Sequence, residues 1–127
     1  MKITRPFDKQ AIAELYNQRP EELLPITLDY ILSDELNAKN RIYCFYTDDM
    51  QVLLGVIFFT EKDGNLYING FSVPKNLDNI IISLNIVINF MDCDLYANTA
   101  SKPAVRVLKL VGFEKVQKNR YRRFKNV

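Results

Sequence analysis

The sequence contains no histidine, and this absence removes several classes of active site at once. Most zinc and other transition-metal centres need histidine or clustered cysteine, but Cys44 and Cys93 are far apart and form no C-x-x-C pair. Ser-His and Cys-His nucleophile pairs and a histidine general base are excluded too. We therefore expect no metal site. Cys44 is interpreted as a small buried hydrophobe inside an apolar segment, and Cys93 as structural, with a reactive thiol as the alternative.

The chain also lacks long apolar runs. None approaches the roughly 18 residues that cross a bilayer. Residues 1–6 show neither the apolar stretch nor the cleavage site of a signal peptide. With 127 residues, 48% hydrophobic and 25% charged, the composition is that of one globular domain spanning 1–127. We expect a cytoplasmic protein with no membrane partner.

Charge is unevenly distributed along the chain. The net charge is only +2, but the last thirteen residues hold six of the basic side chains. The rest of the chain contains eleven Lys and Arg and fifteen Asp and Glu, so its net charge is about −4. The basic group consists of Lys115, Lys118, Arg120, Arg122, Arg123 and Lys125.

The first forty residues predict a strand followed by two helices. The strand covers residues 2–6, and Asp8 caps a helix over 9–19 that ends at Pro20. After a connecting segment at 21–25, Thr27 caps a second helix. Its apolar residues share one face, which predicts that they are buried: Leu28, Ile31, Leu32 and Leu36.

Three consecutive antiparallel strands are predicted next, over residues 41–47, 52–60 and 65–73. Asp63-Gly64 is a typical hairpin turn between the last two. Gly55, set among large apolar residues, indicates a bulge or a close backbone approach, and Gly70 does the same in the next strand.

Residues 78–92 show both an alternating and a helical pattern. Fifteen residues are long for a strand, and the strand expected at 94–97 needs a crossover, so we predict a helix.

The stretch from Ser101 to Phe113 is the most informative part of the chain. Apolar residues at i, i+3, i+4 and i+7 predict a helix with one buried face, which Ser101 caps and Gly112 ends. Two short strands follow, at 114–117 and 120–124. The complete predicted order is β-α-α-β-β-β-α-β-α-β-β.

This order resembles the GNAT superfamily of acyl-CoA-dependent N-acyltransferases. The run Ala-Val-Arg-Val-Leu-Lys-Leu-Val-Gly-Phe, residues 104–113, is similar to the penultimate-helix motif of that family, and Gly55 to its strand glycine. The resemblance implies an α/β (α+β) fold: one mixed sheet of about six to seven strands with about four flanking helices. It also implies acetyl-CoA or another acyl-CoA as substrate and an amine as acceptor.

The resemblance places the acyl-CoA site between the fourth and fifth strands. Backbone from Phe71 to Val73 would position the acyl carbonyl. In the family a glycine-rich loop holds the pyrophosphate, because bare backbone N–H groups at a helix N-terminus favour negative charge. The matching segment here contains no glycine. The expected cofactor-binding residues are Phe71, Ser72, Val73, Lys75, Asn76, Asn79, Asn98 and Ser101.

Two further positions depart from the family pattern. The family's CoA-contacting Asn falls on Ser101, with Asn98 nearby as a substitute. The Tyr that often protonates the leaving thiolate falls on Leu108. The candidates for acid-base catalysis are Glu61 and Tyr67, each with a structural role as the alternative.

Three hypotheses of function remain open. The first is an acyl-CoA-dependent N-acetyltransferase whose acceptor is contacted by Glu21, Glu22 and the loop to Thr27. The second is a non-catalytic protein on the same scaffold, similar to small internal virion proteins of phages, with a protein or virion partner in a host cytoplasm or virion. The third is nucleic-acid contact through the basic, aromatic C-terminus; the alternative there is an edge strand protected by its charges.

Overall fold

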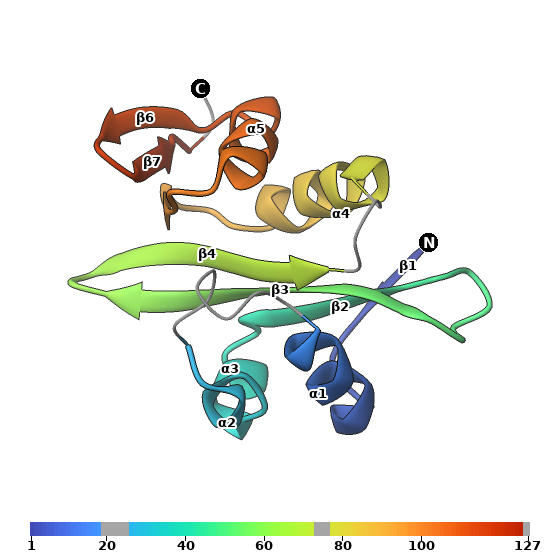
Figure 1. Cartoon of the computed structure of the whole chain (residues 1–127). Helices are drawn as coiled ribbons and strands as arrows, with labels where there is room; N and C mark the ends of the chain where they lie inside the picture. Colours follow the sequence, from blue (N-terminus) through green and yellow to red (C-terminus); the bar gives the residue numbers. More distant parts are fainter. Residues whose placement is uncertain (19–25, 73–76, 126–127) are drawn as a thin grey trace.

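The computed structural model describes residues 1–18, 26–72 and 77–125, with only the backbone described for residues 77–79. Within these ranges, seven strands form one mixed sheet in the order β1-β2-β3-β4-β5-β7-β6, and helices cover both of its faces (Figure 1). The predicted α/β class is confirmed. The elements are β1 (Lys2–Thr4), α1 (Lys9–Asn17), α2 (Leu28–Ile31), α3 (Asp34–Ala38), β2 (Ile42–Tyr46), β3 (Leu53–Lys62), β4 (Asn65–Ser72), α4 (Leu77–Asn89), β5 (Leu95–Asn98), α5 (Lys102–Leu110), β6 (Glu114–Gln117) and β7 (Arg120–Arg123).

The sheet separates two hydrophobic cores. Helices α1, α2 and α3 lie on one face, where Ile12, Ile31 and Phe58 are among the buried side chains (Figure 1). Helices α4 and α5 lie on the other, over a second cluster that includes Phe59 and Val87. Alternate residues of β3 belong to different cores, as the period of a strand requires.

The second predicted helix is wrong as a single element, because the chain forms α2 and α3 with a break at Ser33. The Ser33 hydroxyl donates to the carbonyl of Tyr30 (2.6 Å), and Ser33 itself is extended, with φ −68° and ψ 149°. Such a local side-chain bond competes with the helical pattern. Ile31 and Leu36 are buried as predicted, whereas Leu28 and Leu32 are only partly buried.

The three central strands pair as predicted, β2 with β3 and β3 with β4, all antiparallel. Of the two alternatives predicted for Gly55, the strand pairing shows the bulge. The register shifts next to it, since Phe45 pairs with Gly55 but Tyr46 pairs with Leu53. The Phe45 ring lies over Gly55 so closely that an added Cβ would come within 2.2 Å of it. Cys44, also in β2, is fully buried, and burial raises the pKa of its thiol to about 12.

Helix α5 has the predicted caps. The Ser101 hydroxyl accepts from the Ala104 N–H, and Gly112 follows the helix with φ +98°. The Phe113 N–H donates to the Leu108 carbonyl (2.9 Å), which satisfies one of the last carbonyls of the helix. Phe113 is buried, so the Gly-Phe end anchors α5 in the core.

Candidate functional site

Strands β4 and β5 separate soon after they begin to pair. They are parallel and share only two pairs, Leu66 with Leu95 and Tyr67 with Tyr96. Beyond Tyr67, β4 stays paired to β3 as far as Ser72, while β5 is paired to β7 on its other side over its whole length. The two strands are therefore unpaired between the distal part of β4 and the end of β5, and we call this break in the sheet the opening.

The backbone of β4 gives this opening its chemistry. In a strand, alternate residues direct their backbone N–H and C=O groups toward opposite neighbouring strands. Over residues 68–72, no strand among the described residues pairs with β4 on the side where β5 would lie. Backbone polar groups need partners. An extended ligand that carries amide groups could supply them in the manner of an added strand.

The two faces of β4 differ at the opening. Ile68 points to the α4–α5 core, while Phe71 packs on the other side, with its ring edge-on to Tyr16 (5.7 Å) and to Phe58 (6.4 Å). Ser72 is partly buried at the end of the strand. The expected positions Phe71 and Ser72 thus line the described edge of β4. Val73, Lys75 and Asn76 lie outside the described residues, as do Glu21 and Glu22, and the Asn79 side chain is not described.

The β5–α5 connection forms the other side of the opening. Asn98 is exposed at the end of β5, where its side-chain oxygen accepts from Arg120 Nε (3.3 Å). Ser101 is occupied as a cap: its N–H donates to Thr99 Oγ1 (3.1 Å), and its hydroxyl accepts from the first turn of α5. Asn98 thus ends β5, and Ser101 starts a nine-residue helix whose N-terminal end favours anions.

The two candidate catalytic residues are not brought together. Glu61 pairs in register with Leu66 at the closed end of the β4–β5 pair, and its carboxylate accepts from Arg41 (3.0 Å). Tyr67 pairs with Thr60 and is buried, with its ring 5.5 Å from that of Tyr96. Neighbouring pairs direct side chains to opposite faces, so Glu61 and Tyr67 lie on different sides of the sheet. Their catalytic roles stay predictions.

Leu108 is buried in the core. The position that the family resemblance links to the thiolate acid therefore holds a packing residue. The Tyr67 ring instead lies 6.0 Å from the Arg120 guanidinium, on the β7 side of the opening. Sequence patterns could not place these two residues together, because their contact depends on β7 lying next to β5.

The basic C-terminal residues are held mostly by partners within the chain. Arg122 ion-pairs with Asp94, and the hydrogen bond from its guanidinium holds the pKa of the Asp94 carboxyl below its usual range. The same guanidinium lies over the Phe124 ring (4.3 Å). Lys125 pairs with Asp92 (2.8 Å), and Arg123 donates to the Val111 carbonyl (3.0 Å). These contacts favour a structural role for β7 over nucleic-acid binding. The outer strand β6 is exposed throughout.

Metal centres and membrane-spanning helices are both absent from the part of the chain that the structure describes. No three His, Cys, Asp or Glu side chains there are grouped to hold a metal ion. No helix within the same ranges is long and apolar enough to span a bilayer.

Solved structures share this fold. A GNAT-family acetyltransferase from Bacillus anthracis aligns with a TM-score of 0.63 at 17% identity, covering 94% of this chain and 90% of that one. The ribosomal-protein-S5-alanine acetyltransferase of Vibrio fischeri aligns with a TM-score of 0.60 at 11% identity, covering 73% and 67%. No protein-family model and no curated protein sequence matches the chain. At these identities the likeness shows the fold, which is that of the GNAT acetyltransferases.

Proposed function

We propose that the chain binds acyl-CoA in the opening between β4 and β5 and transfers the acyl group to an amine. The observation that carries the proposal is the early separation of β4 and β5 after two residue pairs. It leaves backbone groups of β4 free for the amides of the pantetheine arm. The fold of the two acetyltransferases adds support at the level of architecture.

The phosphates of the ligand would lie near the helix that follows β4. Helix α4 begins at Leu77, five residues after Ser72, and runs for 13 residues. Its N-terminal N–H groups and dipole favour an anion there. The exposed Asn98 and the start of α5 form the opposite wall.

The reaction would be a direct transfer. The amine nitrogen attacks the thioester carbon, the C–N bond forms, the C–S bond breaks, and CoA leaves as the thiolate, which takes up the proton that the amine loses. Backbone N–H groups of β4 would stabilise the oxyanion. Since Glu61 is bound to Arg41, a water molecule would relay the amine proton to the leaving thiolate.

A second candidate function is acyl-CoA binding without turnover. It is favoured by Leu108, which is buried where an acid would be needed, and by the engagement of Glu61 in an ion pair. On this alternative the domain would act through a protein partner.

One pair of measurements separates the candidates. Acetyl-CoA at about 100 times its dissociation constant should stabilise the fold by about 2.7 kcal/mol, measured as a rise in melting temperature. Thiol release is then followed with a panel of primary amines. Stabilisation with amine-dependent release supports the transferase, stabilisation without release supports the binding domain, and no stabilisation at millimolar acetyl-CoA would contradict both.

A further inference from the structure

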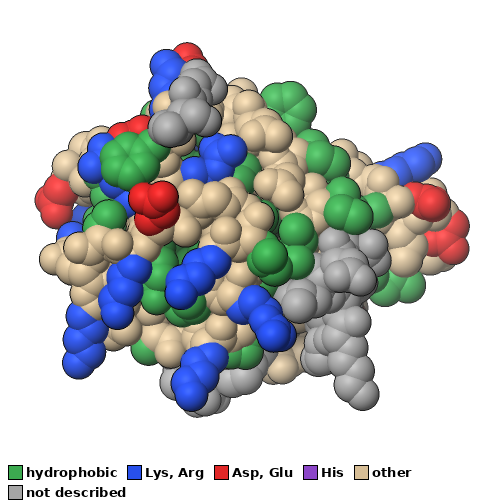
Figure 2. All heavy atoms as spheres, turned by 90° about the horizontal axis from the view of Figure 1, so that it is seen from above, with side chains coloured by type: hydrophobic (Ala, Val, Ile, Leu, Met, Phe, Trp, Pro, Cys, Tyr) green, Lys and Arg blue, Asp and Glu red, His purple; other side chains and the backbone are tan. Residues whose placement is uncertain are grey.

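Helix α4 exposes an apolar stripe that the acyl-CoA site does not use. The side chains of Ile82, Ile86 and Phe90 are four residues apart and 52%, 43% and 73% exposed. They therefore follow one another along the helix surface. Figure 2 looks onto the α4–α5 face, where hydrophobic side chains lie exposed and Lys and Arg side chains gather on another part of the surface.

The stripe carries no charge. The sequence has no Asp, Glu, Lys or Arg between Asn79 and Met91. Isolated exposed apolar residues are common, but a continuous apolar and uncharged helix face indicates an interaction surface. Ser83, a neighbour of Ile86 on the helix, contacts Met1 Sδ (2.9 Å), so the stripe borders β1.

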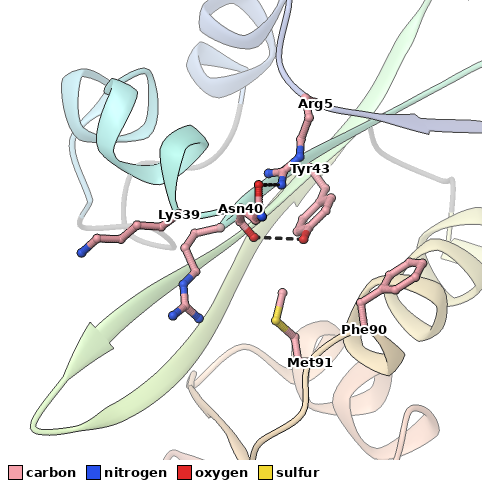
Figure 3. Close-up of a pocket in the computed structure, with 7 residues that line it drawn as sticks. Arg5, Lys39, Asn40, Tyr43, Phe90 and Met91 are labelled. Carbon is pink, nitrogen blue, oxygen red and sulfur yellow. Dashed lines mark hydrogen bonds between the residues drawn. The ribbon is translucent and has the colours of Figure 1, made fainter.

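One end of the stripe is cationic. Phe90 and Met91 line an open cavity of about 410 Å³ together with Arg5, Lys39, Asn40, Arg41 and Tyr43. Figure 3 shows Phe90 and Met91 facing Tyr43 and Asn40 across this cavity, with Lys39 at its rim. Among the described residues no carboxylate lines the cavity itself; beside it, Lys39 pairs with Glu35 (3.4 Å) and Arg41 with Glu61 (3.0 Å), so Arg5 is the cation of the lining that no carboxylate pairs with there. The Nε of Arg41 is buried without a hydrogen-bond partner, which leaves one donor unsatisfied there.

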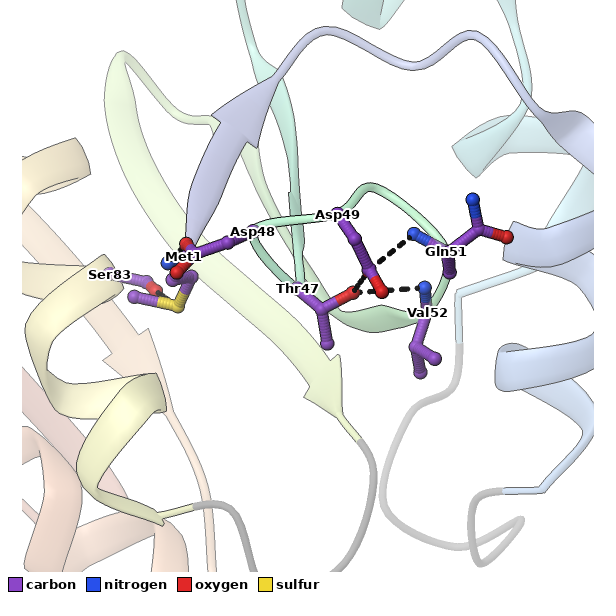
Figure 4. A network of polar contacts seen from close by, with 7 residues as sticks. All are labelled: Met1, Thr47, Asp48, Asp49, Gln51, Val52 and Ser83. Atoms are coloured by element: carbon purple, nitrogen blue, oxygen red, sulfur yellow. Dashed lines mark hydrogen bonds and ion pairs between the residues drawn. The ribbon is translucent and has the colours of Figure 1, made fainter.

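The other end is acidic. The Asp48 carboxylate pairs with the N-terminal ammonium of Met1 yet its side chain remains 83% exposed. Asp49 follows it in the β2–β3 turn, where Thr47 and the Gln51 N–H donate to its carboxylate (Figure 4). These bonds hold the pKa of Asp49 below its usual range, so the turn keeps its negative charge. Figure 4 shows Asp48 and Met1 beside Ser83 of α4.

These features suit a second copy of the chain. We propose that two copies associate around a two-fold axis, with their α4 stripes antiparallel. A two-fold interface uses the same patch on both partners. Antiparallel stripes would bring the Phe90 end of one copy to the Ile82 end of the other. The cationic cavity of each copy then meets the acidic turn of its partner, so each contact forms twice.

The dimensions agree with this arrangement. Ile82 and Phe90 are eight residues apart, about 12 Å along a helix. Tyr43 in the cavity and Asp48 in the turn after β2 are five residues apart, about 17 Å if the chain between them is extended. The charged ends thus flank the apolar stripe. A net charge of +2 leaves little overall repulsion between copies.

The test is sedimentation equilibrium of the full chain and its variants. The wild type should dimerise, and Ile86→Glu should raise the dissociation constant at least about 30-fold, because each copy would bury an unpaired carboxylate. Phe90→Glu serves as a second variant of the stripe. Leu110→Glu is the matched control, since Leu110 is 60% exposed on α5 and lies outside the stripe. All three positions are exposed, so folding should survive, as melting temperatures would confirm.

Charge reversal tests the orientation. Lys39→Glu alone and Asp48→Lys alone should each weaken the dimer about three- to tenfold, because two pairs turn repulsive. Together they should restore affinity to within about twofold of the wild type. A wild type that stays monomeric at 100 μM, equal effects of Leu110→Glu and Ile86→Glu, or a double variant no tighter than the singles would each overturn the proposal. Acetyl-CoA binding should be unchanged in Ile86→Glu, because the two proposals use different surfaces.

Discussion

Helices α4 and α5 cover the same face of the sheet, yet their outward surfaces are opposite in character. Helix α5 exposes Lys102, Arg106 and Lys109, and helix α4 exposes Ile82 and Ile86. Both bury aliphatic side chains in one core, among them Leu108 from α5 and Val87 and Ile88 from α4. The inner surfaces of the two helices are therefore equivalent, and only the outer surfaces differ.

The difference indicates what each helix does beyond folding. A helix with one apolar face and one charged face is complete in a monomer. A helix that is apolar on most sides normally lies within a core, and α4 does so only on its inner side. We attribute the exposed apolar side of α4 to association between two copies of the chain. The start of α5, in contrast, forms one side of the proposed acyl-CoA site.

The largest expected effect contrasts two isoleucines of α4. Ile88→Ala should destabilise the fold by about 2–5 kcal/mol, because Ile88 is fully buried and its truncation leaves a cavity. Ile86→Ala should change stability by less than about 0.5 kcal/mol in the monomer, since its side chain lies on the exposed face of α4 and is 43% exposed. Both changes have the same effect on helix propensity, so urea unfolding of dilute protein compares burial alone. Equal losses would show that the outer stripe is packed within the monomer.

A smaller effect is expected at the end of α5. Gly112 has φ +98°, which a side chain disfavours, so Gly112→Ala should cost about 1–2 kcal/mol. Space is not the reason, because an added Cβ would lie 3.4 Å from Arg123 Nε, an ordinary contact. Lys109→Ala, on the exposed side of the same turn, is the control and should be nearly neutral. Thermal unfolding of the two variants checks this, and an unchanged midpoint for Gly112→Ala would count against the left-handed cap.

The smallest expected change in stability concerns Asp94, in the segment that leads from α4 through β5 to α5. Asp94, between α4 and β5, has a pKa lowered first by the hydrogen bond from Arg122 and then by that from the Lys125 N–H. A lowered folded-state pKa stabilises the fold above the unfolded pKa of about 3.9, and this stabilisation is lost as the pH falls through the folded value. Asp94→Asn should therefore be less stable than the wild type at pH 7, and the gap should narrow below about pH 4. A gap that is constant with pH would contradict the ion pair.

Local signals in the sequence predicted the elements well where they were strong. The cap at Ser101, the apolar spacing and the Gly-Phe end defined α5 completely, because each acts within a few residues. The break at Ser33 was missed, since one hydroxyl bond to Tyr30 outweighed a continuous apolar pattern. Helix α4 was predicted, although its β-branched residues alone would also suit a strand.

The site was harder to predict than the fold. The opening depends on where β5 stops pairing with β4, and β5 in turn pairs with β7, more than twenty residues later in the chain. The partners of Arg122 and Glu61 likewise come from other strands. Non-local pairing of this kind leaves no periodic signal in the sequence.

The central claim is that the opening between β4 and β5 binds acyl-CoA, and calorimetric titration with acetyl-CoA tests it most directly. The comparison is between Asn98→Asp, at the mouth of the opening, and Asn37→Asp, an exposed position in α3 on the opposite face. Both variants add the same charge. We predict that Asn98→Asp weakens binding about tenfold through repulsion of the CoA phosphates, while Asn37→Asp leaves it unchanged. Equal affinities in the two variants, or no heat of binding in the wild type, would contradict the claim.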